Sequence, residues 1–223
     1  LMVRMYCAKA LGTLGDERSL PLLRKALHSK YTGLRMAAVV GLGTLGPTAR
    51  PATADLSQML KQEFPPMHSS VQHIALDDDF GSTRTITMRM HLATLRALGQ
   101  IGGPEAQQIV AEALNTAVNT EMEWAAARAL KAMAANDALM AAGKQGKASA
   151  WRMLAEMKYV EAFPEMLKQA KDTAIPEARR SQVVYALGVL GDRRATPVLL
   201  EMLRGKSDTL SKAAAWSLNM MAD

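Results

Sequence analysis

Near its C-terminal end the chain reads Val183-Val184-Tyr185-Ala186-Leu187-Gly188-Val189-Leu190-Gly191-Asp192, and weaker copies of this stretch recur along most of its 223 residues. With Leu187 as the reference position, the equivalent leucines are Leu11, Leu42, Leu98, Leu130, Leu154 and Leu218. Four of the six intervals between successive reference leucines are 31 to 33 residues long. A period of this size is typical of stacked helical repeats, in which each unit buries its apolar face against its neighbours.

The positions around each reference leucine carry the residue types that packed helices require. Three residues after the leucine the side chain is always apolar, as one turn of a buried helix face demands. Four residues after it, glycine recurs and predicts a helix end in the left-handed conformation. These glycines are Gly15, Gly46, Gly102 and Gly191. Asp16 and Asp192 follow two of them and are expected to cap the next helix.

Second segments with helical spacing of apolar residues run between the reference segments, so each unit is expected to be an antiparallel helix pair. The expected pairs are 17–28 with 34–46, 51–62 with a helix starting near Ile86, 104–134, 136–158, 160–190 and 194–222. Residues 1–15 would be the second helix of a broken first unit. In the unit near 136–158, two glycines and two lysines are expected to shorten the first helix.

The run Arg35-Met36-Ala37-Ala38 before Leu42-Gly43-Thr44-Leu45-Gly46, with Ala-Leu-Gly-x-Leu-Gly-Asp forms at both ends, resembles HEAT repeats. It is most similar to the short bacterial type first described in phycobilisome lyases. The resemblance covers most of the chain except residues 63–85 and the poor unit near 135–150. We therefore expect an all-α fold, a right-handed α-solenoid (α-α superhelix) of about six helix-pair repeats plus a partial N-terminal one. Residues 1–223 would form a single array within a longer bacterial protein.

Residues 63–85 interrupt the array and form its least repeat-like part, which predicts an inserted loop. His68, His73 and Asp77 to Asp79 are competent metal ligands, but the spacing of the two histidines matches no helical pair. We favour a solvated acidic loop over a metal site. A second hypothesis is a partner-binding flap that exposes apolar side chains such as Phe64 and Phe80.

The composition limits the class of protein. The chain is 49% hydrophobic but only 4% aromatic, and its 16 methionines suit narrow layers between helices. No apolar run is long enough to span a membrane, and no signal peptide is visible. Cys7 is the sole cysteine and is expected to be buried. A reducing cytoplasm is the expected compartment, with the periplasm as the alternative.

Basic residues recur at two positions of the repeat. Seven residues before the reference leucine stand four basic residues, Arg4, Arg35, Lys147 and Arg180. The resemblance implies that they brace neighbouring turns, with Asp16 or Asp192 as suitable partners. Two residues before it stand Arg96, Arg128 and Arg152 in successive units, near Arg89, Lys131, Lys144 and Lys147. With a formal net charge of +6, this stripe would attract phosphates or an acidic protein. The alternative is a solvated helix flank balanced by Glu121, Glu123 and Glu156.

The three tryptophans occupy different repeat positions. Trp151 falls at a core position, whereas Trp124 and Trp216 are candidates to line a groove. No catalytic motif, phosphate-binding glycine loop or metal-binding motif is present. We therefore predict no enzymatic activity, no cofactor and no metal, with a lyase or DNA-glycosylase-like enzyme as the third alternative.

The sequence favours a scaffold or adaptor that binds another protein, of acidic character, on its concave helical face. The alternative partner is a nucleic acid bound through Arg96, Arg128 and Arg152. The predicted binding residues are Arg96, Arg128, Arg152, Arg89, Lys131, Trp124, Phe64 and Phe80.

Overall fold

The computed structural model describes residues 2–64 and 83–222, and every regular element in these ranges is a helix. The chain divides into two compact units, residues 1–133 and 134–223. The first unit contains α1 (Met2–Leu14), α2 (Ser19–Leu27), α3 (Thr32–Leu45), the 3-10 helix η1 (Gly46–Ala52), α4 (Thr53–Met59), α5 (Thr83–Ile101), α6 (Pro104–Asn115) and α7 (Thr120–Ala132). The second contains α8 (Asn136–Lys144), α9 (Ala148–Glu156), η2 (Val160–Ala162), α10 (Phe163–Lys171), α11 (Glu177–Leu190), η3 (Arg193–Ala195), α12 (Thr196–Leu203) and α13 (Asp208–Ala222).

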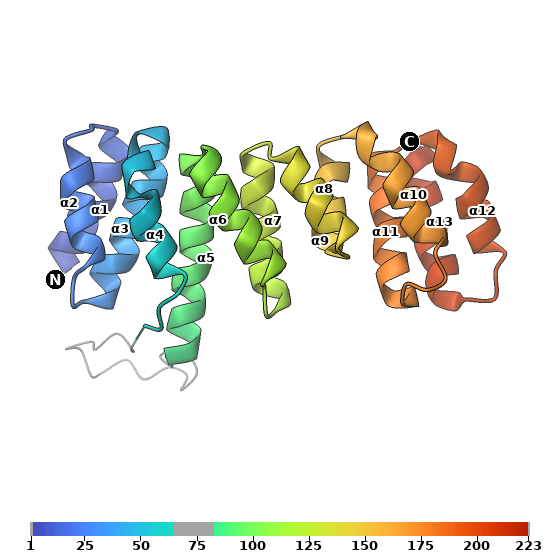
Figure 1. Cartoon of the computed structure of the whole chain (residues 1–223), viewed down its shortest axis with the longest axis horizontal. Coiled ribbons are helices and arrows are strands. Elements are labelled where there is room, and N and C mark those ends of the chain that lie inside the picture. Colours follow the sequence, from blue (N-terminus) through green and yellow to red (C-terminus); the bar gives the residue numbers. More distant parts are fainter. Residues whose placement is uncertain (1, 65–82, 223) are drawn as a thin grey trace. The chain divides into compact units, whose positions relative to one another are not determined.

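The helices of each unit pack in pairs that form two layers. In the first unit the pairs are α2 with α3, α4 with α5 and α6 with α7, while α1, α3, α5 and α7 pack side by side in one layer (Figure 1). In the second unit α8 pairs with α9, α10 with α11 and α12 with α13, and α9, α11 and α13 form the shared layer. The predicted helix pairs and the all-α solenoid are thus confirmed. The expected shortening of the first helix near 136–158 is wrong: α8 has nine residues, as α2 and α10 have. The short helix of this unit is the second one, because α9 has nine residues whereas α7 has 13 and α11 has 14.

Glycines one residue after the reference leucine bring the helices of the shared layer into close contact. A Cβ atom added to Gly99 would lie 2.9 Å from the Cα of Ala129 on the next helix, and one added to Gly188 would lie 2.6 Å from the Cα of Ser217. Real Cβ atoms almost never approach another atom this closely. Gly12 and Gly43 make equivalent contacts. This spacing shows why the repeat requires two glycines, of which the sequence analysis explained only the one at the helix end.

The predicted helix-ending glycines adopt positive φ, at 69° for Gly15, 66° for Gly46, 66° for Gly102 and 79° for Gly191. Two non-glycine residues at the same repeat position also have positive φ: 51° for Ala134 and 55° for Lys158. Lys158 Nζ donates to the carbonyl oxygens of Val189 and Leu190, at 2.5 and 3.3 Å. The side chain therefore caps the C-terminus of α11 from a backbone conformation that non-glycine residues rarely adopt.

Two expectations about local structure were wrong. Cys7 is exposed rather than buried, because no described residue covers that face of α1, whereas the equivalent Ala38 of α3 is buried where α1 packs against α3. Residues 83–85, expected in the inserted loop, form the first turn of α5, which is held by the buried Ile86 in the following turn. Residues 65–82, including Phe80 and the candidate metal ligands His68, His73 and Asp77 to Asp79, lie outside the described residues.

The bracing residues have other partners than predicted. Arg35 donates to Thr32 Oγ1 at 3.0 Å, and its guanidinium carbon lies 4.7 Å from the ring centroid of Phe64. Burial lowers the pKa of this guanidinium. Arg180 Nε donates to the carbonyl oxygen of Ala170 at 2.9 Å, joining α11 to α10.

The two aspartates instead cap their own turns. Asp16 pairs with Arg18 at 2.6 Å, and Asp192 pairs with Arg194 at 2.5 Å and also accepts the Arg194 backbone N–H. The hydrogen bond from the Arg194 side chain lowers the pKa of the Asp192 carboxyl. An arginine two residues away reaches the carboxylate more easily than one on another helix, so the expected long-range pairs do not form.

Candidate functional site

A groove in the first unit runs between α5 and α7 and has a volume of about 860 Å³. Its lining is Leu92, Arg96, Gly99, Gln100, Thr120, Glu121, Trp124, Ala125, Arg128, Ala129 and Ala132. We call it the α5–α7 groove. The lining combines small residues with longer polar side chains and one indole. Three of the residues predicted for binding, Arg96, Trp124 and Arg128, are brought together here.

Repeat geometry places the two arginines of the groove. Arg96 and Arg128 both stand two residues before a reference leucine, on helices that pack directly against each other. Trp124 lies four residues before Arg128 and therefore on the same face of α7. The start of α7 is fixed by Asn119, whose Oδ1 accepts the Met122 backbone N–H at 2.9 Å. The i, i+4 spacing of Trp124 and Arg128 is visible in the sequence and predicts that their side chains share one face of the helix.

The groove offers positive charge beside an aromatic surface. Arg96 and Arg128 are exposed, and over residues 2–64 and 83–222 no ion pair involves either of them. The guanidinium carbon of Arg128 lies 5.9 Å from the ring centroid of the half-buried Trp124, within the range of a cation–π interaction. Glu121, which the sequence analysis treated only as a balancing charge, lines the same groove. The groove thus combines two guanidinium groups, one carboxylate and one indole.

The remaining predicted binding residues lie elsewhere. Arg152 belongs to the second unit, where its Nε donates to Glu156 Oε1 at 3.0 Å, so part of its charge is balanced. Arg89 is exposed on α5 and Lys131 is half-buried on α7, and neither lines the groove. A stripe of three arginines stays a prediction, because the structure groups only Arg96 with Arg128.

Phe64 is a core residue rather than an exposed contact of a flap. It is fully buried, its ring lies edge-on to His91 with centroids 6.3 Å apart, and its backbone N–H donates to Thr87 Oγ1 at 2.8 Å. His91 Nε2 also lies 2.9 Å from the carbonyl oxygen of Gln62. These contacts anchor the segment after α4 against α3 and α5. Trp151, predicted to be core, is fully buried, and Trp216 is 37% exposed and packs edge-on to Tyr185.

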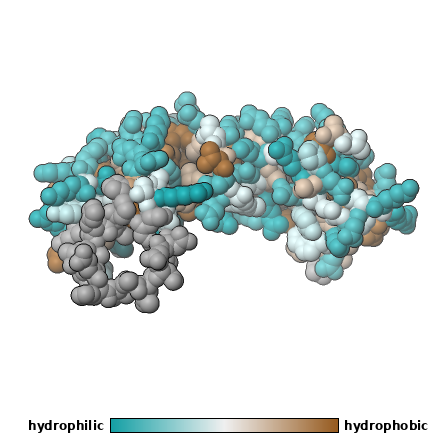
Figure 2. Space-filling model, turned by 90° about the horizontal axis from the view of Figure 1, so that it is seen from below, coloured by the Kyte–Doolittle hydropathy of each residue, from teal (hydrophilic) through white to brown (hydrophobic). Residues whose placement is uncertain are grey.

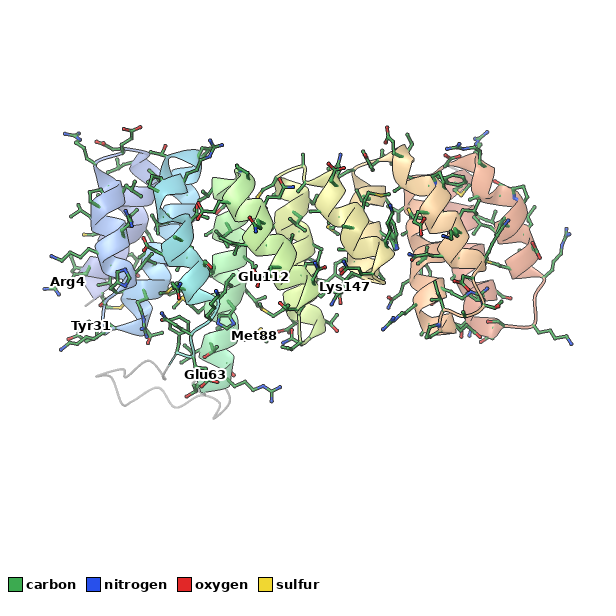
Figure 3. The ribbon with its side chains drawn as sticks, viewed as in Figure 1. Arg4, Tyr31, Glu63, Met88, Glu112 and Lys147 are labelled. Carbon is green, nitrogen blue, oxygen red and sulfur yellow. The ribbon has the colours of Figure 1, made fainter. Side chains whose placement is uncertain are left out.

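A second hollow of the first unit, of about 760 Å³, lies between the end of α4, α5, α6 and the α6–α7 turn. Figure 3 labels three of its lining residues, Glu63, Met88 and Glu112. Lys61 and Arg84 stand on its rim with the two glutamates, so charges of both signs balance there. On the face shown in Figure 2, hydrophobic side chains form small groups among hydrophilic ones. Of these two hollows of the first unit, the α5–α7 groove is the one in which arginines outside any ion pair lie beside a tryptophan.

In the part of the chain that the structure describes, no group of three or more His, Cys, Asp or Glu residues is arranged to hold a metal ion. None of the helices described combines the length and the apolar character needed to cross a lipid bilayer.

The stacked helix pairs define an α-solenoid. The family model for HEAT repeats matches residues 2–71 and 137–219, and the model for the PBS lyase HEAT-like repeat matches residues 92–116. The chain belongs to the HEAT-repeat family. Among curated proteins, none matches this chain.

Several solved structures are similar to the chain. Human deoxyhypusine hydroxylase in complex with glycerol is 17% identical, with a TM-score of 0.42, over 99% of this chain and 80% of the hydroxylase. The complex of CpcE and CpcF of phycocyanin lyase from Nostoc sp. PCC7120 is 20% identical, with a TM-score of 0.40, and the match covers 98% of this chain and 72% of the lyase chain. An engineered protein is 16% identical, with a TM-score of 0.40, and the match covers 98% of this chain and 90% of the engineered chain. These likenesses concern the fold alone.

The prediction that excluded enzymatic activity is wrong. Two of these similar structures, the hydroxylase and the lyase, carry the names of enzymes. The absence of a familiar catalytic motif in a helical-repeat sequence therefore does not separate scaffolds from enzymes.

Proposed function

We propose that the chain is a protein-interaction module whose α5–α7 groove binds an acidic segment of a partner protein. The observation that carries this proposal is the pairing of two exposed arginines, Arg96 and Arg128, with the half-buried Trp124 in one groove. HEAT repeats typically mediate protein interactions, so the family supports the same class of function.

The chemistry of the groove favours a carboxylate-bearing chain with an apolar side chain. Arginine presents a planar fork that matches a carboxylate, and a half-buried indole supplies a large contact area with little loss of side-chain entropy. Packed helices lie about 8–10 Å apart, and Arg96 and Arg128 stand at equivalent positions on two of them. The partner would therefore place one carboxylate on each arginine, with an apolar residue over Trp124. Glu121 in the lining would repel any anionic group placed beside it, so it favours two separate carboxylates over a continuous run of negative charge.

Removing the two arginines is expected to weaken binding of such a segment at least about tenfold, because two charge-assisted contacts are lost. The measurement is fluorescence anisotropy with labelled peptides in which two glutamates flank a leucine at separations of two to seven residues. The wild type is compared with the Arg96→Ala/Arg128→Ala variant. A charge-matched control is Lys25→Ala/Lys168→Ala, in which both replaced residues are exposed on other helices. Equal affinity in the two variants, or no binding of any peptide by the wild type, would contradict the proposal.

Nucleic acid is the second candidate, and the cation–π pair of Arg128 and Trp124 is the observation that favours it, since an indole also stacks on bases. We expect oligonucleotide binding to be weak and to disappear near physiological salt, because only two unpaired arginines line the groove. Anisotropy with single- and double-stranded oligonucleotides at low and near-physiological salt measures this. Binding that persists at the higher salt and is lost in an Arg96→Ala/Arg128→Ala/Arg152→Ala variant would place nucleic acid ahead of protein.

A further inference from the structure

A separate basic pocket lies in the second unit, between the C-terminal end of α8, the α8–α9 turn and the N-terminal part of α11. Its volume is about 270 Å³. Lys144 of α8 and Arg179 of α11 supply its charges, and Ile175, Pro176 and Val183 form an apolar wall. We call it the α8–α11 pocket.

Two cations from different helices share this pocket without a compensating acid. No acidic residue belongs to the lining, and across the described part of the chain neither Lys144 nor Arg179 forms an ion pair. Arg179 Nη1 lies against the α8–α9 turn, only 3.3 Å from where a Cβ atom on Gly146 would stand. Gly146 has a φ of 89°, so the turn needs glycine for its backbone conformation. The turn therefore allows the guanidinium to lie in the same pocket as Lys144.

The buried side of the pocket is formed by Trp151 and Gln169, whose polar groups hydrogen-bond to protein atoms. Trp151 is fully buried, and its Nε1 donates to Gln169 Oε1 at 2.9 Å. Gln169 Nε2 in turn donates to the carbonyl oxygen of Gly143 at 3.2 Å. Because these groups pair with one another, a ligand would gain its polar contacts from the two cations at the mouth and its apolar contacts from the wall.

We propose that the α8–α11 pocket binds a small organic oxyanion, a phosphate monoester or a carboxylate that carries a small apolar group. Arginine contacts such a group through two parallel N–H donors, and lysine adds a mobile positive charge. The pocket has the volume of about nine water molecules at roughly 30 Å³ each, which suits an anionic head with part of a small ring. This site lies outside the α5–α7 groove and takes a small molecule, so it goes beyond the proposed function and does not depend on it.

Isothermal titration with phenyl phosphate, inorganic phosphate and benzoate tests the proposal on the full chain. We expect phenyl phosphate to bind with a dissociation constant of about 1 mM or below and more tightly than inorganic phosphate, because its ring reaches the apolar wall. Phenyl phosphate binding tighter than that of benzoate assigns the pocket to phosphate monoesters, and the reverse order assigns it to carboxylates.

The Lys144→Ala/Arg179→Ala variant is expected to lose at least about tenfold in affinity. Lys168→Ala/Arg193→Ala is the matched control, since it removes two exposed charges of the same unit that lie outside the lining. Circular dichroism checks that both variants fold, which is expected because all four side chains are exposed. Absence of binding by all three anions at millimolar concentration overturns the proposal, as does equal affinity in both variants.

Discussion

Replacing Gly188 by valine is expected to destabilise the second unit by about 2–3 kcal/mol, because the new side chain would overpack the contact between α11 and α13. A Cβ atom at this position would lie 2.6 Å from both the Cα and the Cβ of Ser217. Ser217 is itself fully buried and its hydroxyl donates to the carbonyl oxygens of Val184 and Ala213, so the α13 backbone has little freedom to retreat. Urea denaturation, with hydrogen exchange of the α11 and α13 amides, measures the loss.

The direction of the stability change in Gly188→Val distinguishes an effect of helix packing from an effect of helix propensity. Valine is a slightly better helix former than glycine, by about 0.3–0.5 kcal/mol, so propensity alone predicts a small gain in stability. The control is Ala215→Val, which places the same side chain at an exposed position of α13 and should cost less than about 1 kcal/mol. A Gly188→Val variant as stable as the wild type would show that the helices separate easily and that the glycine is not required for contact.

The helix pairs could be predicted from the sequence because one pattern repeats around each reference leucine. A buried leucine, an apolar residue one turn later and a glycine at the helix end all report local geometry, and local geometry is encoded locally. The contact between Gly99 and Ala129 joins residues 30 positions apart, but it recurs at Gly12, Gly43 and Gly188. Its signal was therefore present in the spacing, as a glycine one residue after the leucine.

Side-chain partners were harder to predict than helices. Arg35 and Asp16 carry opposite charges at suitable repeat positions, but Asp16 pairs with Arg18 two residues away and Arg35 lies against Phe64. An exposed ion pair gains little free energy, so small local differences decide which pair forms. The position of Phe64 was missed for a related reason: it follows α4 in irregular backbone, where periodicity gives no information about burial.

The α5–α7 groove lies between these two cases. The equivalence of Arg96 and Arg128 and the i, i+4 spacing of Trp124 and Arg128 follow from helical periodicity, so their shared face was predictable. The presence of Glu121 and the hollow itself depend on how far apart the side chains of α5 and α7 stand, which no local pattern fixes. Arg152 has the same repeat position, yet Glu156 one turn later on α9 pairs with it.

Truncating Trp151 to alanine is expected to produce the largest loss of stability in the second unit, about 3–5 kcal/mol. The indole is fully buried against Gly143, where an added Cβ atom would lie 2.5 Å from the ring, so the surrounding helices fit closely around it. Its removal leaves a cavity that α8 and α9 cannot fill without moving, and it deprives the buried Gln169 Oε1 of its donor. Denaturant unfolding with hydrogen exchange of the α9 amides measures the cost.

A double-mutant cycle separates the two contributions. Trp151→Phe keeps most of the apolar volume but leaves Gln169 Oε1 without its donor, which should cost about 1–3 kcal/mol. Gln169→Leu removes the acceptor and leaves the indole N–H and the Gly143 carbonyl oxygen unpaired. In the double variant the indole N–H and Gln169 Oε1 are both absent, so its cost should fall below the sum of the two single losses by about 1 kcal/mol. Strictly additive losses would mean that the hydrogen bond contributes nothing and that Trp151 stabilises the unit through its volume alone.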